Sequence, residues 1–384
     1  MTLKNKQEIV TGAELISRAA IDAGVNFFAG YPITPASSVY SGMLNKLQSE
    51  GKLAIGASDE ISALAMCIGA SMRGAKSMTA TAAPGLSLMV ESIGYAFTTE
   101  IPVLIVLGQR LGPSTGAATQ SAEGDISFVQ SLISGGFQIP VFAPNSILNC
   151  YETTIKAINC SEKYRTPVIL LTEKDILMSS TNISVEEFEK CKSSTPIIER
   201  TYRNIDDTRP YKTYNFNQLN EVPDFVAAGI GTEDRVVATA STHDKAGRLL
   251  KDSPEVMEVI QHLRAKIEAN VEDISEYKLE LEAGAVITVI SFLASDLSAR
   301  EAIKAARAQG ILINHLTIFS IFPVPATAIK EAVSTAQRVV IPEVNANGQY
   351  AEIIRPLLVD KELVKVNSIA DLIKPEDILK HLIN

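Results

Sequence analysis

The sequence predicts an α/β protein built on doubly wound parallel sheets. Short, β-rich apolar runs alternate with helix-length amphipathic segments, which is the pattern of successive βαβ units. The runs are apolar at successive positions rather than at every second one, as expected for strands that helices cover on both faces. With 384 residues, of which 46% are hydrophobic and 21% charged, the chain is long enough for two domains with well-filled cores.

The first predicted domain spans residues 1–186. Helical patterns separate its expected strands from one another, as in a parallel sheet. These strands are predicted at residues 25–28, 53–56, 77–81, 103–107, 139–142 and 168–171.

Residues 187–284 are predicted to form a connecting region, because the composition shifts there toward charged residues, Pro, Asn and Asp. A charged helical pattern over 255–280 predicts one exposed helix in this region. A second, smaller α/β domain is expected over residues 285–384. Its elements are predicted as a strand at 286–292, a helix at 295–308, a strand at 311–316, a helix at 326–336 and a strand at 339–341.

Charge and composition exclude several classes of protein. The net charge of -9 and the pI near 5.2 argue against nucleic acid or an anionic membrane as a partner. No secretory signal and no apolar stretch of about 20 residues is present, so we expect a cytoplasmic protein without a membrane span. The four cysteines are scattered without a Cys-x-x-Cys spacing, so we expect neither an iron–sulfur cluster nor a structural zinc site, and no metal ligand is predicted in this chain.

A proline-stiffened loop follows the first predicted strand of the larger domain. Residues 30–35 read Gly-Tyr-Pro-Ile-Thr-Pro, and the two prolines fix φ on either side of Ile33 and Thr34. The Thr34 hydroxyl is therefore presented by a stiff loop at the carboxyl end of a strand, where open α/β sheets bind ligands. The alternative is an ordinary turn before a helix that begins near residues 36–38.

Glu60 stands at the start of an otherwise apolar helical pattern that is rich in small residues. A carboxyl group buried there without a partner would cost several kcal/mol. Either Glu60 faces water as a first-turn acid that the helix dipole favours, or it meets a donor that this chain does not supply.

Two further turns carry groups that could bind a ligand. Residues 109–119, Gln-Arg-Leu-Gly-Pro-Ser-Thr-Gly-Ala-Ala-Thr, offer three hydroxyls, two glycines and Arg110, whose guanidinium can grip a carboxylate by two parallel bonds. Arg110 could instead pair structurally with Glu60 or Asp125. Residues 81–87 form a strand-to-helix turn for which packing is the favoured role. His243 has no nucleophile near it in sequence, which favours a structural role.

The common nucleotide and hydrolase signatures are absent. The chain contains no Gly-x-x-x-x-Gly-Lys-Ser/Thr loop, no Gly-x-Ser-x-Gly elbow and no Gly-x-Gly-x-x-Gly fingerprint. The usual routes to nucleotide binding and to serine hydrolysis therefore lack support.

Taken together, four segments resemble the alpha subunit of 2-oxoacid:ferredoxin oxidoreductases in their order and spacing. They are residues 31–35, the Asp-Glu helix start at 59–60, the Ala-Thr-Ala-Ala-Pro-Gly-Leu-Ser-Leu-Met turn at 80–89 and the Gln-Arg-Leu-Gly-Pro-Ser-Thr-Gly loop at 109–116. The resemblance continues through residues 242–247, 319–326 and 341–345, so it covers nearly the whole chain. The form of the 109–116 loop is most similar to the 2-oxoglutarate enzyme, with the branched-chain (2-oxoisovalerate) enzyme as the alternative.

This resemblance implies a thiamine-diphosphate-binding-like, pyrimidine-type first domain and a smaller, transketolase-C-terminal-like second domain. It implies that Glu60 faces a ring nitrogen of the cofactor's aminopyrimidine, and that Thr34 and Arg110 are catalytic alongside it. The residues implied to bind the cofactor are Tyr31, Pro32, Ile33, Thr34, Glu60, Pro84 and Gly85. Those implied to bind the substrate are Thr34, Arg110 and Thr119.

The resemblance also implies a reaction and a set of partners. The reaction is oxidative decarboxylation of a 2-oxoacid to acyl-coenzyme A and carbon dioxide with electrons passing to ferredoxin, or its reverse. No Gly-Asp-Gly with a downstream Asn is found, so a beta subunit is expected to hold the pyrophosphate, Mg2+ and a [4Fe-4S] cluster. A gamma subunit and a ferredoxin-like subunit are expected as further partners. The open alternatives are a thiamine-dependent enzyme that does not use ferredoxin and a non-catalytic α/β scaffold subunit.

Overall fold

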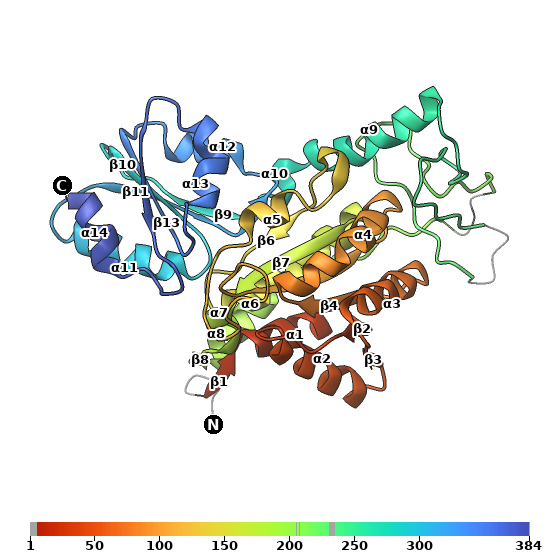
Figure 1. The fold of residues 1–384 in the computed structure, drawn as a ribbon, viewed down its shortest axis with the longest axis horizontal. Helices are drawn as coiled ribbons and strands as arrows, with labels where there is room; N and C mark the ends of the chain where they lie inside the picture. The colour runs from red at the N-terminus through yellow and green to blue at the C-terminus, as the bar shows by residue number, and fades with distance from the viewer. Residues whose placement is uncertain (1–5, 205, 207, 230–234, 384) are drawn as a thin grey trace.

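The computed structural model describes residues 6–204, 206, 208–229 and 235–383, which form two α/β bodies that lie side by side (Figure 1). The larger body is built on a seven-stranded sheet and the smaller on a five-stranded sheet. After α8 (Val185–Ser194) the chain runs to the end of the larger body that is remote from the smaller one. Helices α9 (Pro254–Glu268) and α10 (Val271–Ile274) then lead it back.

The seven strands of the larger sheet stand in the order β12-β6-β7-β5-β4-β2-β3, and all except β12 are parallel to their neighbours. The predicted parallel sheet is confirmed, and each strand predicted in this half overlaps an observed one. Their bounds are β2 (Phe27–Gly30), β3 (Leu53–Gly56), β4 (Ser77–Thr81), β5 (Val103–Gln109), β6 (Val141–Phe142), β7 (Pro167–Glu173) and β12 (Ser320–Phe322).

Helices cover both faces of this sheet, as the continuous apolar runs predict. Along β5, Ile105 and Leu107 pack into the hydrophobic core under α3 and α4, whereas Leu104 and Val106 pack into the core under α1, α2 and α6. The helices of this body are α1 (Gly12–Asp22), α2 (Ser37–Ser49), α3 (Glu60–Met72), α4 (Ala83–Thr98), α5 (Ile126–Gln130), α6 (Asn149–Tyr164) and α7 (Lys174–Met178), with a 3-10 turn, η2 (Ser134–Gly136).

The smaller sheet has the order β14-β13-β10-β11-β9, with β9 antiparallel and the others parallel. The three strands and two helices predicted here are present. The strands are β9 (Tyr277–Glu280), β10 (Ile287–Ser291), β11 (Ile313–Ile318), β13 (Arg338–Glu343) and β14 (Glu362–Asn367). The helices are α11 (Ser295–Arg307), α12 (Ala326–Ala332), α13 (Gln349–Ile354) and α14 (Pro375–Ile383), with a 3-10 turn, η3 (Arg355–Leu357).

One hydrophobic core continues from the larger sheet into the smaller one. Leu107 of β5, Phe292 after β10 and Phe322 of β12 belong to the same buried cluster. Strand β12 also crosses over, because it pairs antiparallel with β6 of the larger sheet. The boundaries at residues 186 and 284 stay a prediction.

The single exposed helix predicted over residues 255–280 is wrong in its second half. Helix α9 starts after Ser253, whose hydroxyl accepts the Val256 amide at 3.2 Å, and it ends at Glu268. Residues 277–280 instead form β9, which pairs with β11. The charged sequence suits a helix locally, but pairing with a neighbouring strand decides the structure.

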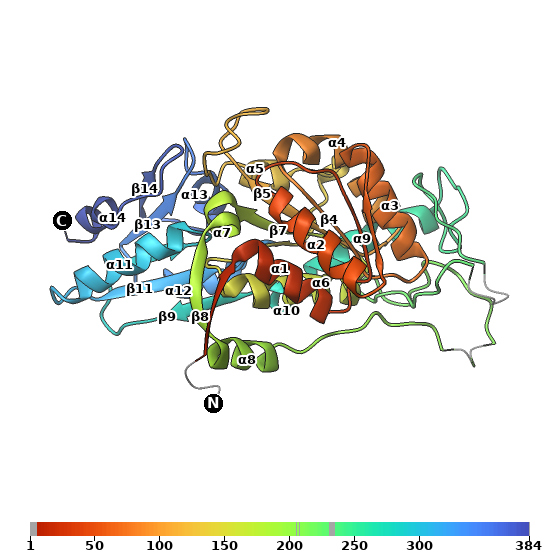
Figure 2. The same ribbon diagram turned by 90° about the horizontal axis from the view of Figure 1, so that it is seen from below.

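Four more strands, β1 (Gln7–Thr11), β8 (Ser180–Ser184), β12 and β14, were not predicted, and each pairs with a strand that is distant in sequence. β1 and β8 form a separate antiparallel ribbon that ties the start of the chain to the end of β7 (Figure 2). β14 is half-exposed at the edge of the smaller sheet and lacks a continuous apolar run.

A buried ionic cluster fixes the connecting region to the larger body. Lys266 of α9 lies 2.5 Å from Glu100, measured from Nζ to Oε2, and both side chains are almost fully buried. His262 Nε2 lies 3.3 Å from the other Glu100 oxygen. The Arg165 guanidinium donates to the Pro223 and Asp224 carbonyls. No helix in the described part of the chain is long and apolar enough to cross a membrane.

Candidate functional site

Four of the segments singled out from the sequence meet at one edge of the larger sheet. The strands β5, β4, β2 and β3 are neighbours in that order, and they point the same way. Residues 31–35 follow β2, Glu60 follows β3, residues 82–85 follow β4 and Arg110 follows β5. This is the carboxyl edge of the sheet, where α/β proteins bind ligands.

Glu60 is the first residue of α3, but it does not cap the helix. Asp59 does so, accepting the Ser62 amide at 2.7 Å in a capping box. The Glu60 side chain is thereby left to turn inward, and the residue is only 6% exposed. No residue that the structure describes forms a hydrogen bond with its carboxylate. The low exposure of the residue argues against a fully solvated first-turn acid.

Gly85, at the start of α4, makes room for the Glu60 carboxylate. A Cβ at position 85 would lie 2.5 Å from Glu60 Oε1 and would also overlap the Thr81 hydroxyl. Pro84 sits in the first turn of the same helix, where its missing N–H costs no hydrogen bond. Gly85 and Pro84 thus leave space for the Glu60 carboxylate at this edge of the sheet, where its oxygens form no hydrogen bond with the described residues.

We expect Gly85→Ala to displace Glu60, because neither Thr81 nor the helix backbone can retreat by the required distance. The chain should lose about 1–3 kcal/mol of stability through overpacking, and turnover of the assembled protein should fall with it. Gly94→Ala in the same helix is the matched control, since a Cβ there meets no atom within 4 Å. Chemical denaturation of both variants checks the difference, and equal stability would contradict the close approach.

Arg110 is buried and points toward the Thr34 loop. Its Nη1 donates to the Thr34 carbonyl at 2.7 Å, and its Nε is buried without a partner. Within residues 6–204, 206, 208–229 and 235–383, Arg110 forms no ion pair with Glu60 or Asp125. The alternative that Arg110 is part of a structural ion pair is therefore wrong, and most of its donors are unused.

The remaining predicted residues lie at different depths. Ile33 and Thr34 are half-buried, whereas Tyr31 and Pro32 are exposed. Thr119 is exposed just after a projecting loop whose ends, Leu111 and Ala117, form a backbone bridge (Figure 2). The carbonyl of the next residue, Gln120, accepts the Leu111 amide at 3.0 Å. The structure thus brings Thr34 and Arg110 into direct contact, whereas Thr119 forms no hydrogen bond with either of them within the described residues.

A cavity of about 430 Å3 opens beside Arg110, between the loop after β5 and the smaller body. Besides Arg110 it is lined by Ala83, at the start of α4, and by Asp125. From the smaller body, Asn345 and Gln349 complete the wall. Sequence reasoning singled out Asp125 only as a possible partner of Arg110. In the sequence, only the family resemblance over residues 341–345 pointed to Asn345, and no feature of the sequence pointed to Gln349 as a site residue.

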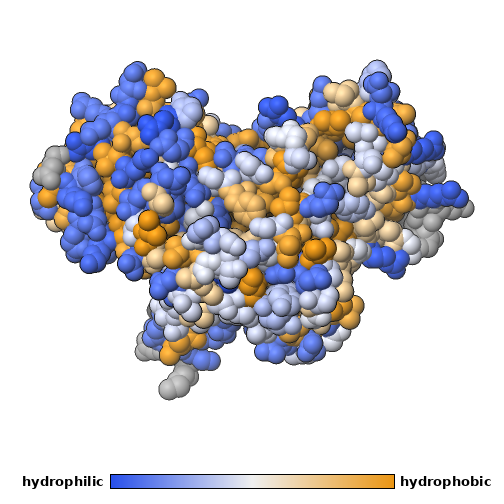
Figure 3. Space-filling view, viewed as in Figure 1, coloured by the Kyte–Doolittle hydropathy of each residue, from blue (hydrophilic) through white to orange (hydrophobic). Residues whose placement is uncertain are grey.

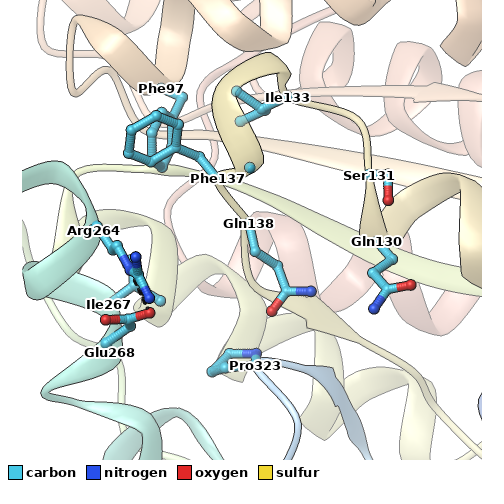
Figure 4. Close-up of a pocket in the computed structure, with 11 residues that line it drawn as sticks. Phe97, Gln130, Ser131, Ile133, Phe137, Gln138, Arg264, Ile267, Glu268 and Pro323 are labelled. Carbon is cyan, nitrogen blue, oxygen red and sulfur yellow. Dashed lines mark hydrogen bonds and ion pairs between the residues drawn. The ribbon is translucent and has the colours of Figure 1, made fainter. Parts of the chain in front are cut away.

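A separate cavity of about 540 Å3 contains none of the predicted site residues. It lies between Phe97, the η2 turn, α9 and Pro323, and the side chains of Gln130 and Gln138 extend toward it (Figure 4). The only charged side chains in its wall, Arg264 and Glu268, pair with each other at 2.6 Å. The carboxyl edge with Glu60 and Arg110 is therefore the better candidate.

His243 and Cys67, two other residues with reactive side chains, have surroundings that favour structural roles. His243 is buried, stacks on Tyr214 and contacts the Asp244 carbonyl through Nδ1, which agrees with a structural role. Burial raises the pKa of the Cys67 thiol to about 12, so this cysteine is no nucleophile. Among the described residues, no group of three His, Cys, Asp or Glu side chains could hold a metal ion.

Two known families match most of the chain. The family described as pyruvate flavodoxin/ferredoxin oxidoreductase, thiamine diphosphate-binding, matches residues 18–243, a range that includes all the predicted site residues. The family described as pyruvate:ferredoxin oxidoreductase core domain II matches residues 283–378.

Individual relatives extend over the whole chain. The 2-oxoglutarate synthase subunit KorA of Methanothermobacter thermautotrophicus is 32% identical over 98% of both chains. The 2-oxoglutarate:ferredoxin oxidoreductase of Magnetococcus marinus, solved with 2-oxoglutarate, coenzyme A and succinyl-CoA bound, has a TM-score of 0.90 and 29% identity. That alignment covers 98% of this chain and 64% of the length of the other.

A split-gene transketolase, solved as an inactive beta4 tetramer, shares the fold at 13% identity, with a TM-score of 0.56 over 97% of both chains. The predicted fold class, with its thiamine-diphosphate-binding-like and transketolase-like parts, is confirmed. The chain therefore belongs to the 2-oxoacid:ferredoxin oxidoreductase family, an oxidoreductase family, and resembles its alpha subunits of the 2-oxoglutarate type throughout its length.

Proposed function

We propose that this chain is the alpha subunit of an enzyme that converts 2-oxoglutarate and coenzyme A to an acyl-coenzyme A and carbon dioxide, with electrons passing to ferredoxin, or runs the reverse reaction. The observation that carries the proposal is Glu60, which is only 6% exposed as a residue and whose carboxylate forms no hydrogen bond with any described residue. The position of Arg110 at the same edge of the sheet and the names of the relatives support the choice of a 2-oxoacid as substrate. A branched-chain 2-oxoacid is the second candidate.

The residues around Glu60 fit the aminopyrimidine part of thiamine diphosphate. Glu60 offers an unused carboxylate, and Gly85 leaves the backbone of α4 open beside it. Tyr31, Pro32, Ile33, Thr34 and Pro84 would form the rest of the wall on the carboxyl edge. Bound thiamine diphosphate supplies the carbon nucleophile and the electron sink that cleavage next to a ketone needs. Glu60 would hold a proton at a ring nitrogen and so keep that ring reactive.

The other half of the cofactor site requires a second protein. The described part of this chain offers no group of acids that could hold Mg2+. On α3 and α4, however, three large apolar side chains are exposed, those of Ile61, Met66 and Leu88, and apolar side chains reach the surface around α4 in Figure 3. Exposed apolar surface of this kind favours a protein interface. We assign it to a beta subunit that brings the pyrophosphate site, Mg2+ and a [4Fe-4S] cluster, with gamma and ferredoxin-like subunits completing the complex.

Arg110 is the side chain suited to the carboxylate of the substrate. Its planar guanidinium has unused N–H donors, because the bond to the Thr34 carbonyl is the only hydrogen bond that Arg110 makes within the described residues. Thr34 would contact cofactor and substrate from the opposite side, and Thr119 would reach the substrate from the projecting loop. The dry setting of Arg110 strengthens its attraction for an anion.

We expect Arg110→Lys to raise KM and to lower kcat/KM by about tenfold or more, because a point charge cannot reproduce two parallel bonds. Arg73→Lys is a matched control, since Arg73 is exposed and donates to the Ala228 carbonyl away from the site. Steady-state kinetics of the complex check this. An unchanged kcat/KM in the Arg110 variant would contradict carboxylate recognition by Arg110.

The proposed function is tested by purifying the native complex and measuring reduction of methyl viologen with a panel of 2-oxoacids and coenzyme A. We expect 2-oxoglutarate to give the highest kcat/KM. A clear preference for a branched 2-oxoacid would replace the substrate but keep the reaction. Absence of reduction with every 2-oxoacid, together with thiamine diphosphate affinity that Glu60→Ala does not change, would favour the non-catalytic scaffold. Copurification of an iron–sulfur protein separates the ferredoxin-dependent reaction from thiamine-dependent reactions without ferredoxin.

A further inference from the structure

We propose that Asp125 is a positioning residue that turns Arg110 toward the substrate carboxylate, an inference that rests on the proposed function. Asp125 comes directly before α5 and shares the 430 Å3 cavity with Arg110. It is not a residue of the four segments that suggested the family.

The backbone places Asp125 firmly beside the end of β5. Gln109, the last residue of β5, accepts the Asp125 amide through Oε1 at 3.0 Å. Gln349 of the smaller body donates to the Gly124 carbonyl at 2.7 Å and accepts the Ser127 amide at 2.8 Å. The peptide on either side of Asp125 is therefore held from two directions, and its carboxyl group is fixed next to Arg110.

Three polar atoms of this group are buried without a partner, and they are complementary to one another. They are the donors Gln109 Nε2 and Arg110 Nε and the acceptor Asp125 Oδ2. A buried polar atom without a hydrogen-bond partner costs about 1–3 kcal/mol. Without a ligand, these three atoms therefore have a higher free energy than they would have if they were paired with one another. An anion that draws the Arg110 Nη atoms away from the Thr34 carbonyl would let Nε turn to Asp125 Oδ2.

Charge supports the same pairing. Burial raises the pKa of Asp125 to about 6, and the positive charge of Arg110 opposes that rise. Three other acids stand at the adjoining elements, but hydrogen bonds already engage them. Glu123 accepts from Ser295 and Val344, Glu173 from Ser121, Asp175 and Ile176, and Glu343 from Asn345, Tyr350 and Ala351. Asp125 is the acid that lines the cavity together with Arg110, and it carries its charge above about pH 6.

The experiment compares Asp125→Asn with the wild-type complex and with Asp252→Asn, an exposed aspartate that serves as control. We expect Asp125→Asn to raise KM for 2-oxoglutarate about tenfold above pH 6, with a much smaller change in kcat, because one charge-assisted orienting contact is lost. In the wild type, KM should rise as pH falls through about 6, since protonation removes the Asp125 charge. The asparagine variant should lack this dependence.

Two further measurements separate positioning from a structural role. The dissociation constant of glutarate, a carboxylate that cannot react, should rise in parallel with KM. In the Arg110→Lys background, Asp125→Asn should have little additional effect. Equal additional effects in both backgrounds, or an unchanged pH dependence of KM, would overturn the proposal. Failure of the wild-type complex to turn over any 2-oxoacid would instead refute the proposed function, and this outcome can be distinguished from failure of the proposal for Asp125.

Discussion

Replacing Glu60 with glutamine should abolish turnover of the assembled complex while leaving the chain folded. Glutamine has the same size and can still form a hydrogen bond in the space beside Gly85, but it cannot exchange a proton with a ring nitrogen. Loss of acid–base assistance of this kind lowers rates by about 100-fold to 10,000-fold. We expect kcat to fall by at least the lower of these factors.

Asp59→Asn is the control for Glu60→Gln, because it makes the same chemical change one residue earlier. Asparagine caps a helix as well as aspartate does, so the start of α3 should be preserved. Single-turnover and steady-state assays of both variants, with thermal unfolding to show that both are folded, make the comparison. Wild-type kcat in the glutamine variant would refute the role of Glu60.

Replacing Lys266 with methionine should be the most destabilising single change considered. Methionine fills the same space, but it leaves the Glu100 carboxylate buried with only His262 within ion-pair distance. Loss of one partner from a buried pair costs about 3–5 kcal/mol, and the double variant Glu100→Gln, Lys266→Met should recover much of that loss. Urea denaturation of the isolated chain checks both, with Lys163→Met, at the exposed pair with Asp273, as the small-effect control.

The pH dependence of stability should show the same cluster. Burial raises the pKa of Glu100, but the charges of Lys266 and His262 outweigh that effect and hold the pKa well below its ordinary value of 4.5. A carboxyl group with a depressed pKa stabilises the folded state above its unfolded pKa, and this stabilisation is lost as the pH falls further. We expect the wild type to lose stability below about pH 4.5 more steeply than the double variant. Equal slopes would show that Glu100 is not ionised in the folded chain.

Much of the fold could be predicted because most strands of the larger sheet can be identified from their own local sequence. β5 and β7 are continuous apolar runs between helices, and burial on both faces leaves such runs no other structure. By contrast, the three residues of β12 become a strand only by pairing with β6, and β9 only by pairing with β11. The local sequence of β12 or β9 does not indicate either pairing, so these strands could not be predicted from it.

The candidate site likewise has residues that the local sequence predicts and residues that only the tertiary structure brings in. Glu60, Thr34 and Arg110 could be predicted, since each follows a strand in a loop of unusual composition, and parallel strands bring such loops to one edge. Asp125 was singled out only as a possible partner of Arg110, and Gln349 could not be assigned to the site, because it reaches the cavity only through the packing of the two bodies. Asp59 was predicted as part of the helix start, and its capping bond explains why the neighbouring Glu60 is free to turn inward.

A structure of the complete complex with thiamine diphosphate bound would decide the role of Glu60. We expect the Glu60 carboxylate to lie within hydrogen-bonding distance, about 2.6–3.2 Å, of a nitrogen of the aminopyrimidine ring, with the exposed apolar side chains of α3 and α4 covered by the beta subunit. A cofactor bound elsewhere, or a Glu60 carboxylate that faces bulk water in the assembled complex, would contradict the proposed function.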